Sequence, residues 1–248
     1  YFLNEVDILK NTNHQNIIKL YEIKNSQKNF YLMMEYCNGG TLNEIFENYF
    51  DKYLRPFPEI YVQHILRQVS CGLYYLHKSN IIHRDLKMEN ILFNYESLED
   101  AKEMNVLNSE LKIIDFGFAK YLNDSSVASS ICGSPINMDP VILKALAFKQ
   151  IGQDFGYTEK ADMWSLGIMV YTMLIGKPPF IASNYKDLYL QINEGNYEIP
   201  KQLKLSKQAI SLINGLLQFD HAERLSIDEL VFHEYLTLDE NDFEFCEL

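Results

Sequence analysis

The chain has 248 residues, 47% of them hydrophobic, and carries 22 Lys and Arg against 34 Asp and Glu, a formal net charge of −12. A chain of this size can bury a large core, as one domain or as two lobes. The negative charge argues against nonspecific binding to nucleic acid or to an anionic membrane surface.

The four cysteines are scattered and form no CxxC pair. Their spacing favours reduced thiols in the cytosol or nucleus over a disulfide framework or a zinc site. The longest apolar stretch, residues 163–176, is too short to span a bilayer and is expected to be a buried helix. No segment resembles a signal peptide, so we expect a cytoplasmic protein without a transmembrane segment.

Apolar residues at helical spacing predict a first helix over residues 2–11. Residues 17–23 and 29–36 are rich in β-branched and aromatic side chains, which predicts two strands joined by a turn at residues 25–28. A buried helix is expected to begin near Pro58. These elements lead into a stretch of unusual polarity.

That stretch reads IIHRDLKMENILF, residues 81–93, and places Asp85, Lys87 and Asn90 in a short polar break between apolar runs. Buried polar atoms without partners cost about 1–3 kcal/mol each, so the break needs a chemical reason. Phosphoryl transfer supplies one. It requires a carboxylate to orient an attacking alcohol and accept its proton, cations to balance phosphate charge, and oxygen ligands for magnesium.

A second stretch, LKIIDFGFA at residues 111–119, is an apolar strand that ends in Asp115, Phe116 and Gly117. Asp115 could bind magnesium, while Gly117 allows a sharp backbone turn. A plain strand–turn–strand core is the alternative interpretation. The spacing of the two stretches, however, resembles the protein kinase signature, with HRDLKxxN as catalytic loop and DFG as metal loop.

The resemblance implies an α+β fold with a small lobe and a mainly helical large lobe, with ATP and Mg²⁺ as cofactors. Asn90 and Asp115 would be the metal ligands. Residues 1–36 would be part of the small lobe, containing helix C and strands four and five. Residues 37–236 would be the large lobe, and residues 237–248 an acidic C-terminal extension.

Within the small lobe, Glu5 resembles the glutamate that pairs with a phosphate-binding lysine; a solvated helix charge is the alternative. That lysine and the Gly-rich phosphate loop would lie upstream of residue 1. We therefore expect this chain by itself to be inactive.

The run MMEYCNGGTL, residues 33–42, resembles the hinge between kinase lobes. The resemblance makes Met34 the gatekeeper and sets the backbone of Glu35 and Cys37 against adenine. Leu92 and Ile114 would close the apolar slot below, although each also fits a plain core position.

Residues 121–132 are rich in serine and have few large apolar groups, as in a kinase activation segment. Arg84 indicates a segment that docks on an arginine once phosphorylated, and Ser130 is the expected phosphorylation site. A polar loop without a regulatory role is the alternative. The other candidate sites are Ser125, Ser126 and Ser129.

Ser134 resembles the serine or threonine that hydrogen-bonds the catalytic aspartate and lysine, here Asp85 and Lys87. Lysine at position 87 is the form of the loop found in Ser/Thr kinases. We therefore expect transfer to Ser or Thr hydroxyls of proteins rather than to Tyr.

One departure from the family concerns Arg224, which stands where kinases keep a buried arginine. The Ala-Pro-Glu motif that supplies its partner is replaced by Met-Asp-Pro-Val at residues 138–141. Removing one partner of a buried ion pair costs about 3–5 kcal/mol. The sequence therefore predicts a substitute carboxylate near Arg224, from Asp139, Asp154 or Glu159.

Asp162 opens an apolar helix and resembles the aspartate that binds the catalytic-loop backbone from below; it could also be a plain N-cap. Residues 95–110 are longer than a tight hairpin needs and predict a polar surface insertion. Amphipathic helices over residues 185–193, 207–217 and 227–235 would complete the large lobe.

The linking sequence most resembles the autophagy-initiating ULK-type kinases, on the strings LMMEYCNGGTL, LKIIDFGFAKYL and ICGSPINMDP. This implies phosphorylation of proteins that start autophagosome formation. Protein substrates, ATP and autophagy regulatory subunits would be its partners, and nucleic acid would not. The alternatives are a calmodulin-dependent-type Ser/Thr kinase and a pseudokinase that binds nucleotide or partners without transfer.

Overall fold

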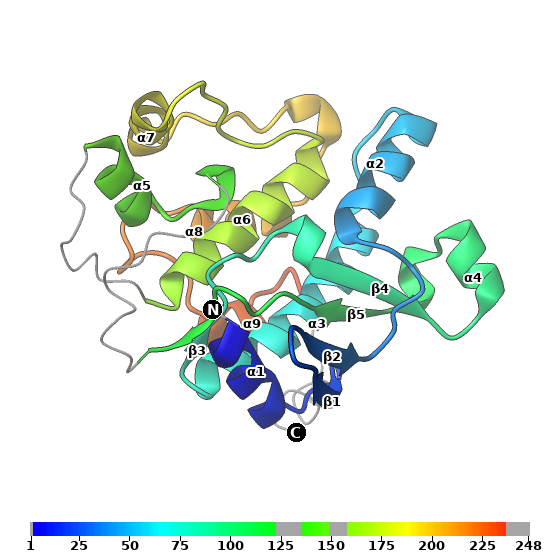
Figure 1. The fold of residues 1–248 in the computed structure, drawn as a ribbon. Coiled ribbons are helices and arrows are strands. Elements are labelled where there is room, and N and C mark those ends of the chain that lie inside the picture. The colour runs from blue at the N-terminus through cyan, green and yellow to red at the C-terminus, as the bar shows by residue number, and fades with distance from the viewer. Residues whose placement is uncertain (1, 123–134, 149–157, 237–248) are drawn as a thin grey trace.

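The computed structural model describes residues 2–122, 135–148 and 158–236, which form a two-lobed α+β structure (Figure 1). The N-terminal part contains one helix and a β-hairpin, and the larger part is mainly helical. Residues 237–248, the expected acidic extension, lie outside the described residues.

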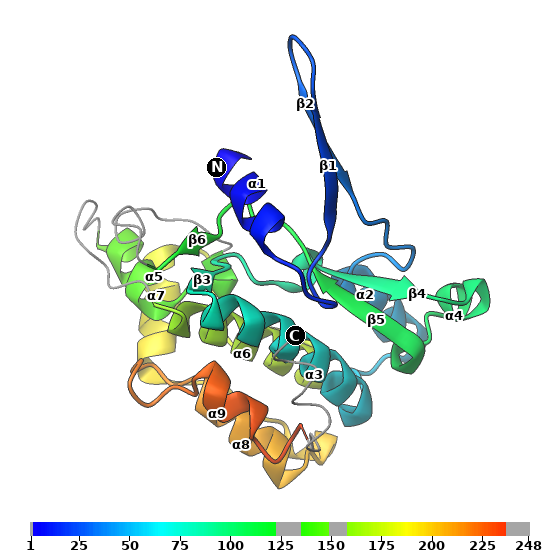
Figure 2. The same ribbon diagram turned by 90° about the horizontal axis from the view of Figure 1, so that it is seen from below.

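The N-terminal part begins with α1 (Phe2–Asn11), the predicted first helix. The predicted hairpin is also present, with β1 (Leu20–Asn25) antiparallel to β2 (Phe30–Met34), although both strands are shorter than expected. Figure 2 shows this hairpin projecting away from the helical body. At its base, Ile18 N donates to Ile113 O at 3.0 Å, which ties the hairpin to the large lobe.

The segment after β2 runs close to β4 (Ile91–Tyr95), which pairs with β5 (Ser109–Ile113). Gly39 N donates to Phe93 O at 2.9 Å. A Cβ at Gly39 would lie 2.5–2.7 Å from atoms of Tyr95 and Phe93, so only glycine permits this approach. The chain then enters α2 (Leu42–Tyr53), which Thr41 starts with a capping box.

Two long helices, α3 (Glu59–Lys78) and α6 (Lys160–Ile175), form the centre of the large lobe. Figure 2 shows them between the β4–β5 hairpin on one side and α8 and α9 on the other. Nearly all side chains of α6 are buried, which confirms the predicted buried helix. None of the helices in the described ranges combines the length and the apolar character needed to cross a membrane.

Shorter elements complete this lobe. The outer helices are α5 (Pro140–Ala147), α7 (Tyr185–Glu194), α8 (Lys207–Leu216) and α9 (Ile227–Val231). The last helix is shorter than the predicted 227–235. A short sheet pairs β3 (Ile81–Ile82) with β6 (Lys120–Tyr121), and single 3-10 turns are η1 (Met88–Asn90), η4 (Pro135–Asn137) and η5 (Lys201–Leu203).

The insertion between β4 and β5 is more ordered than its polar sequence indicates. It contains α4 (Leu98–Glu103), capped by Ser97, and the 3-10 turn η2 (Val106–Asn108). Asp100 accepts hydrogen bonds from the side chains of Asn105 at 2.8 Å and Asn108 at 2.9 Å. A six-residue helix is too short to show a helical period of apolar residues, so the sequence did not reveal it.

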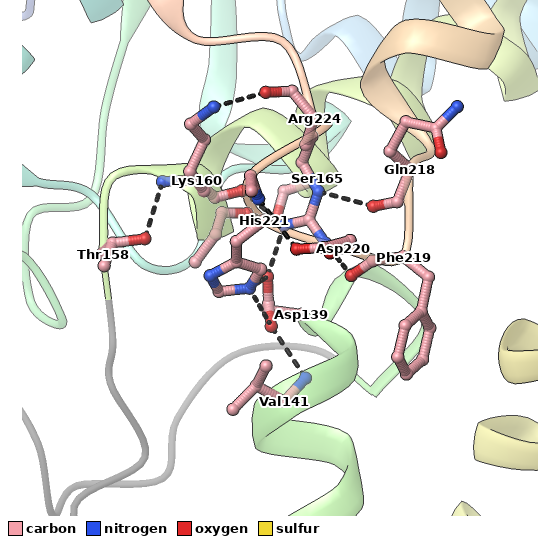
Figure 3. A network of polar contacts seen from close by, with 12 residues as sticks. Asp139, Val141, Thr158, Lys160, Ser165, Gln218, Phe219, Asp220, His221 and Arg224 are labelled. Atoms are coloured by element: carbon pink, nitrogen blue, oxygen red, sulfur yellow. Dashed lines mark hydrogen bonds and ion pairs between the residues drawn. The ribbon is translucent and has the colours of Figure 1, made fainter.

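A buried ion pair joins the start of α5 to the C-terminal part of the chain (Figure 3). Arg224 Nη1 lies 2.6 Å from Asp139 Oδ2, and both side chains are buried. Of the three candidates, Asp139 is therefore the carboxylate that meets Arg224, as the sequence predicted; Asp154 lies outside the described residues. Asp139 also caps α5 by accepting from Val141 N at 2.8 Å.

Further contacts fix this pair in place. Arg224 donates to the carbonyls of Lys160 at 2.7 Å and Gln218 at 2.8 Å, and His221 Nε2 lies 3.0 Å from Asp139 Oδ2. Burial acts to raise the pKa of Asp139, but the hydrogen bond from His221 and the charge of Arg224 outweigh burial and hold it below its ordinary value. Each member of the buried ion pair therefore has further hydrogen-bonding partners besides the other member.

Replacing Asp139 with Asn should lower the free energy of unfolding by about 3–5 kcal/mol, because Arg224 would keep its buried charge without a counter-ion. Urea denaturation of the chain measures this loss. Glu223→Gln is the matched control, because Glu223 is exposed and its replacement removes the same negative charge. A loss for Asp139→Asn no larger than for the control would contradict this account.

Candidate active site

The polar side chains of the HRDLKMEN stretch cluster after β3. Lys87 Nζ lies 2.7 Å from Asp85 Oδ2, and Asn90 Nδ2 donates to Asp85 O at 2.8 Å and to Asp85 Oδ2 at 3.2 Å. Asp85 is 4% exposed and Asn90 is 5% exposed. The structure therefore brings three of the predicted site residues together around one buried carboxylate.

The β4–β5 hairpin brings Asp115 to the same place. Ile91 pairs with Ile113 in the hairpin register, and Ile114 N donates to Asn90 O at 2.9 Å. Asp115 follows directly and is exposed, with a φ of 61° and with Gly117 N donating to its Oδ1 at 3.3 Å. The catalytic-loop and metal-loop stretches thus meet at one end of this hairpin.

A buried carboxylate holds the catalytic loop from below. Asp162 is 0% exposed and accepts from the backbone N–H groups of His83 and Arg84, each at 2.9 Å. His77 Nε2 lies 2.9 Å from the same side chain. The alternative interpretation of Asp162 as an N-cap is wrong, because Glu159 holds that position and makes no side-chain cap.

Burial acts to raise the pKa of Asp162, but the hydrogen bond from His77 and the neighbouring His83 outweigh burial and keep it below its ordinary value. The carboxylate therefore stays ionised at neutral pH although it is fully enclosed. No motif in the sequence analysis singled out His77. Its partner lies 85 positions away along the chain, so no local pattern could have indicated the contact.

His83 links the two loops from the inside. Its Nε2 lies 2.9 Å from Ile114 O, and its ring packs edge-on against Phe116 at a centroid distance of 5.2 Å. Phe116 is fully buried. These contacts give His83 a structural role between the two loops.

Glu5 lies near Asp115, at the edge of the same site. Burial, and then the negative charge of Asp115, raise the pKa of Glu5. The helix that carries Glu5 is tied to the segment after Gly117, because Asn4 donates to Ala119 O. A cation between the two carboxylates would relieve their repulsion.

Glu35, one of the predicted hinge residues, forms an ion pair with a buried lysine that the sequence did not indicate. Lys112 Nζ lies 3.0 Å from Glu35 Oε1 and 3.2 Å from Glu110 Oε2. Burial, with a smaller effect of Glu35, raises the pKa of Cys37 to about 11, so its thiol is neutral at neutral pH. Met34 is partly exposed on β2.

Leu92 and Ile114 are half-buried and lie on the β4–β5 hairpin and at its end. Arg84 is buried within the catalytic loop. Ser130 and Ser134, the expected regulatory and loop-binding serines, lie outside the described residues.

A model of the protein kinase domain matches residues 1–236. The chain belongs to the protein kinase family. Its motifs and its α+β architecture were identified correctly from the sequence.

Known kinases similar to the chain include serine/threonine-protein kinase ULK1 of Homo sapiens, 36% identical over 233 residues that cover 94% of the chain and 21% of that protein. Serine/threonine-protein kinase ATG1 of Kluyveromyces marxianus is 33% identical over 270 residues, covering 97% of the chain and 31% of that protein. Serine/threonine-protein kinase atg1 of Dictyostelium discoideum is 35% identical over 244 residues, covering 96% and 32%. The chain thus spans about a fifth to a third of the length of these relatives.

The oxygen atoms in this kinase site suit Mg²⁺. Asn90 uses its amide nitrogen on Asp85, which leaves its carbonyl oxygen for a metal, and Asp115 supplies an exposed carboxylate. The described residues contain no cluster of three His, Cys, Asp or Glu side chains that could hold a metal ion by themselves. Two protein ligands completed by phosphate oxygens and water are the usual arrangement for Mg²⁺.

Replacing Asp162 with Asn should cost about 1–3 kcal/mol of stability, because His83 N and Arg84 N donate to different carboxylate oxygens and an amide has only one acceptor oxygen. Hydrogen exchange at these two amides should accelerate, and urea denaturation should show the loss. Asp228→Asn is the control, since its ion pair with Lys78 is exposed to solvent and should contribute little to stability. Equal effects of the two variants would show that the buried carboxylate is not required.

Proposed function

We propose that the protein to which this chain belongs is a Ser/Thr protein kinase that transfers the γ-phosphate of ATP to Ser or Thr hydroxyls of proteins. The observation that carries this proposal is the cluster of Asp85, Lys87 and Asn90 at the end of the hairpin that also leads to Asp115. When bound, ATP with Mg²⁺ supplies the phosphoryl group and its electrophilic activation.

Each side chain of the cluster has a separate task in this proposal. The Asp85 carboxylate orients the substrate hydroxyl and accepts its proton late in the reaction. The Lys87 ammonium, 2.7 Å away, balances negative charge that gathers on the phosphate oxygens. Asn90 and Asp115 hold the metal through their oxygen atoms. Ser134 would hydrogen-bond Asp85 and Lys87.

The adenine pocket in this proposal is formed by the hinge backbone at Glu35 and Cys37, with Met34 as the gatekeeper. Leu92 and Ile114 close it from the large-lobe side, which fits their half-buried positions. Glu5 would pair with the phosphate-binding lysine.

The similarity to ULK1 and ATG1 supports a role in autophagy initiation, in the cytoplasm and with regulatory subunits of that process. The chain covers only part of the length of those proteins, so the proposed role in autophagy concerns the complete protein and not the kinase domain alone.

A pseudokinase remains the second candidate function, since the Ala-Pro-Glu motif is replaced. The Asp139–Arg224 pair weakens that argument, because a carboxylate one position before Pro140 meets the buried arginine. The presence of Asp85, Asn90 and Asp115 together favours catalysis.

Phosphate transfer to a protein substrate by the complete protein tests this function. Asp85→Asn should lower kcat by about 10²–10⁴-fold, because the hydroxyl loses its proton acceptor while the fold keeps a side chain of the same shape. Asp51→Asn, which alters an exposed carboxylate on α2, is the control and should retain full activity. Equal phosphate incorporation by wild type and Asp85→Asn would remove Asp85 from the mechanism.

Regulation is tested at Ser130. If a phosphate there pairs with Arg84, Ser130→Ala should lower the activity of the complete protein, and mass spectrometry should find a phosphopeptide that contains residue 130. Ser183→Ala, at an exposed serine outside residues 121–132, is the matched control. Unchanged turnover together with the absence of any phosphopeptide from residues 121–132 would refute this regulation.

A further inference from the structure

A groove with a volume of about 670 Å³ lies between α2, the beginning of α3 and the insertion that joins β4 to β5. The insertion is the segment for which the kinase reaction provides no role. It contributes α4 and η2 to one wall of the groove, while α2 forms the opposite wall. Figure 1 shows α2 and α4 on the same side of the molecule, away from α5 and α7.

The α2 wall is a single stripe of side chains. Ile45, Asn48, Tyr49, Lys52 and Tyr53 line the groove, and their spacing of three and four residues places them on one face of the helix. The same helix also packs against β4 and η1, the turn that ends at Asn90. One helix therefore contacts both the groove and the catalytic loop.

Aromatic side chains that pack against one another form the floor of the groove. The ring of Tyr49 lies 4.7 Å from that of Tyr53, 5.0 Å from that of Phe57 and 5.8 Å from that of Tyr61. Phe57 is buried, whereas Tyr53 is exposed. Aromatic packing of this kind provides a rigid apolar surface that binds apolar side chains at low entropic cost.

The rim is positively charged, although the chain as a whole carries −12. Lys52 and Lys102 are exposed, line the groove, and have no ion-pair partner in the described part of the chain. Lys52 Nζ lies 5.0 Å from the centre of the Tyr53 ring. Glu103 is the lining carboxylate. Two lysines against one carboxylate, next to aromatic rings, complement a ligand that is both acidic and apolar.

Met104 adds an apolar side chain to this wall. It ends α4 with a φ of 53°, in a left-handed conformation that normally selects Gly or Asn. Its flexible side chain lines the groove and is 40% exposed. An exposed, flexible thioether side chain on the groove wall can adapt to apolar side chains of different shapes.

We propose that this groove docks a segment of the protein substrate in which acidic side chains alternate with apolar ones. The proposal rests on the proposed kinase function. Strand β4 has five residues and runs from Asn90 to the insertion, which at about 3.3 Å per residue separates the groove from the catalytic loop by roughly 17 Å. The docking segment would therefore lie about five or more residues from the acceptor hydroxyl.

The charge of the rim is tested by peptide binding to the 248-residue chain. The probe is a fluorescent nonapeptide of alternating acidic (Asp, Glu) and apolar (Leu, Phe) residues, measured by anisotropy at about 0.1 M salt. Lys52→Glu combined with Lys102→Glu should weaken binding by about tenfold or more. Lys144→Glu with Lys186→Glu, on α5 and α7, changes the net charge equally and should leave the affinity unchanged. Equal weakening by both pairs would overturn the proposal.

The apolar contribution is tested at Met104. Met104→Gly relieves the left-handed backbone, so the melting temperature should not fall, yet binding of the same peptide should weaken several-fold. Asn80→Gly is the matched control, because Asn80 is also left-handed, with a φ of 56°, and does not line the groove. Unchanged affinity of Met104→Gly would overturn the proposed apolar contact.

Two further measurements identify the occupant. Residues 239–248 of this chain are themselves acidic and contain two phenylalanines; if the peptide bound only after their deletion, the chain's own segment would be the ligand and the substrate assignment would be wrong. In the complete protein, the double Lys variant should raise KM about tenfold for a substrate that carries the docking segment, with kcat unchanged. A fall in kcat alone would overturn the proposal.

The two proposals fail separately in these experiments. Peptide binding is measured without phosphate transfer, and Asp85→Asn should bind the peptide as tightly as wild type. Binding without any transfer by the complete protein would reject the proposed kinase activity. Transfer without peptide binding would reject the docking groove alone.

Discussion

The catalytic loop depends on a carboxylate that is completely removed from water. An ionised Asp162 in the interior would be strongly unfavourable without partners, and two backbone N–H groups of the loop together with His77 supply them. The dependence is mutual, because His83 N and Arg84 N have no helix or strand to satisfy them. A left-handed residue such as Arg84, with a φ of 71°, is held by these bonds next to Asp85.

The same principle operates at the end of the activation segment, where the chain departs from its family. A buried arginine requires a carboxylate, but it does not require one at a particular sequence position. Asp139 meets this requirement from the N-cap of α5 and stabilises the helix as well. The replacement of the Ala-Pro-Glu motif therefore changes the position of the carboxylate in the sequence, while the ion pair with the buried arginine is retained.

The β4–β5 hairpin connects two chemically different regions. At one end its register brings Asn90 and Asp115 together, and this end is constrained by the groups that the reaction needs. At the other end the insertion is free of that constraint and forms a groove with α2. Because α2 also packs on η1, a partner bound in the groove lies one helix away from the catalytic residues.

The sequence by itself determined the family and most of the elements, and it predicted the side chains that we propose for the reaction. Asp85, Lys87, Asn90 and Asp115 could be recognised because their chemistry and spacing are local, and α6 because a helix that is apolar all round must be buried. The sequence also predicted a carboxylate partner for Arg224, but it left three candidate residues open.

The tertiary structure alone decided which partners meet. Asp139, His77 and Lys112 find their charged or hydrogen-bonding partners through contacts between distant parts of the chain, which leave no periodic signal in the sequence. The same holds for α4 and the groove beside it, because a short helix has no recognisable period and a groove exists only where separate elements pack side by side.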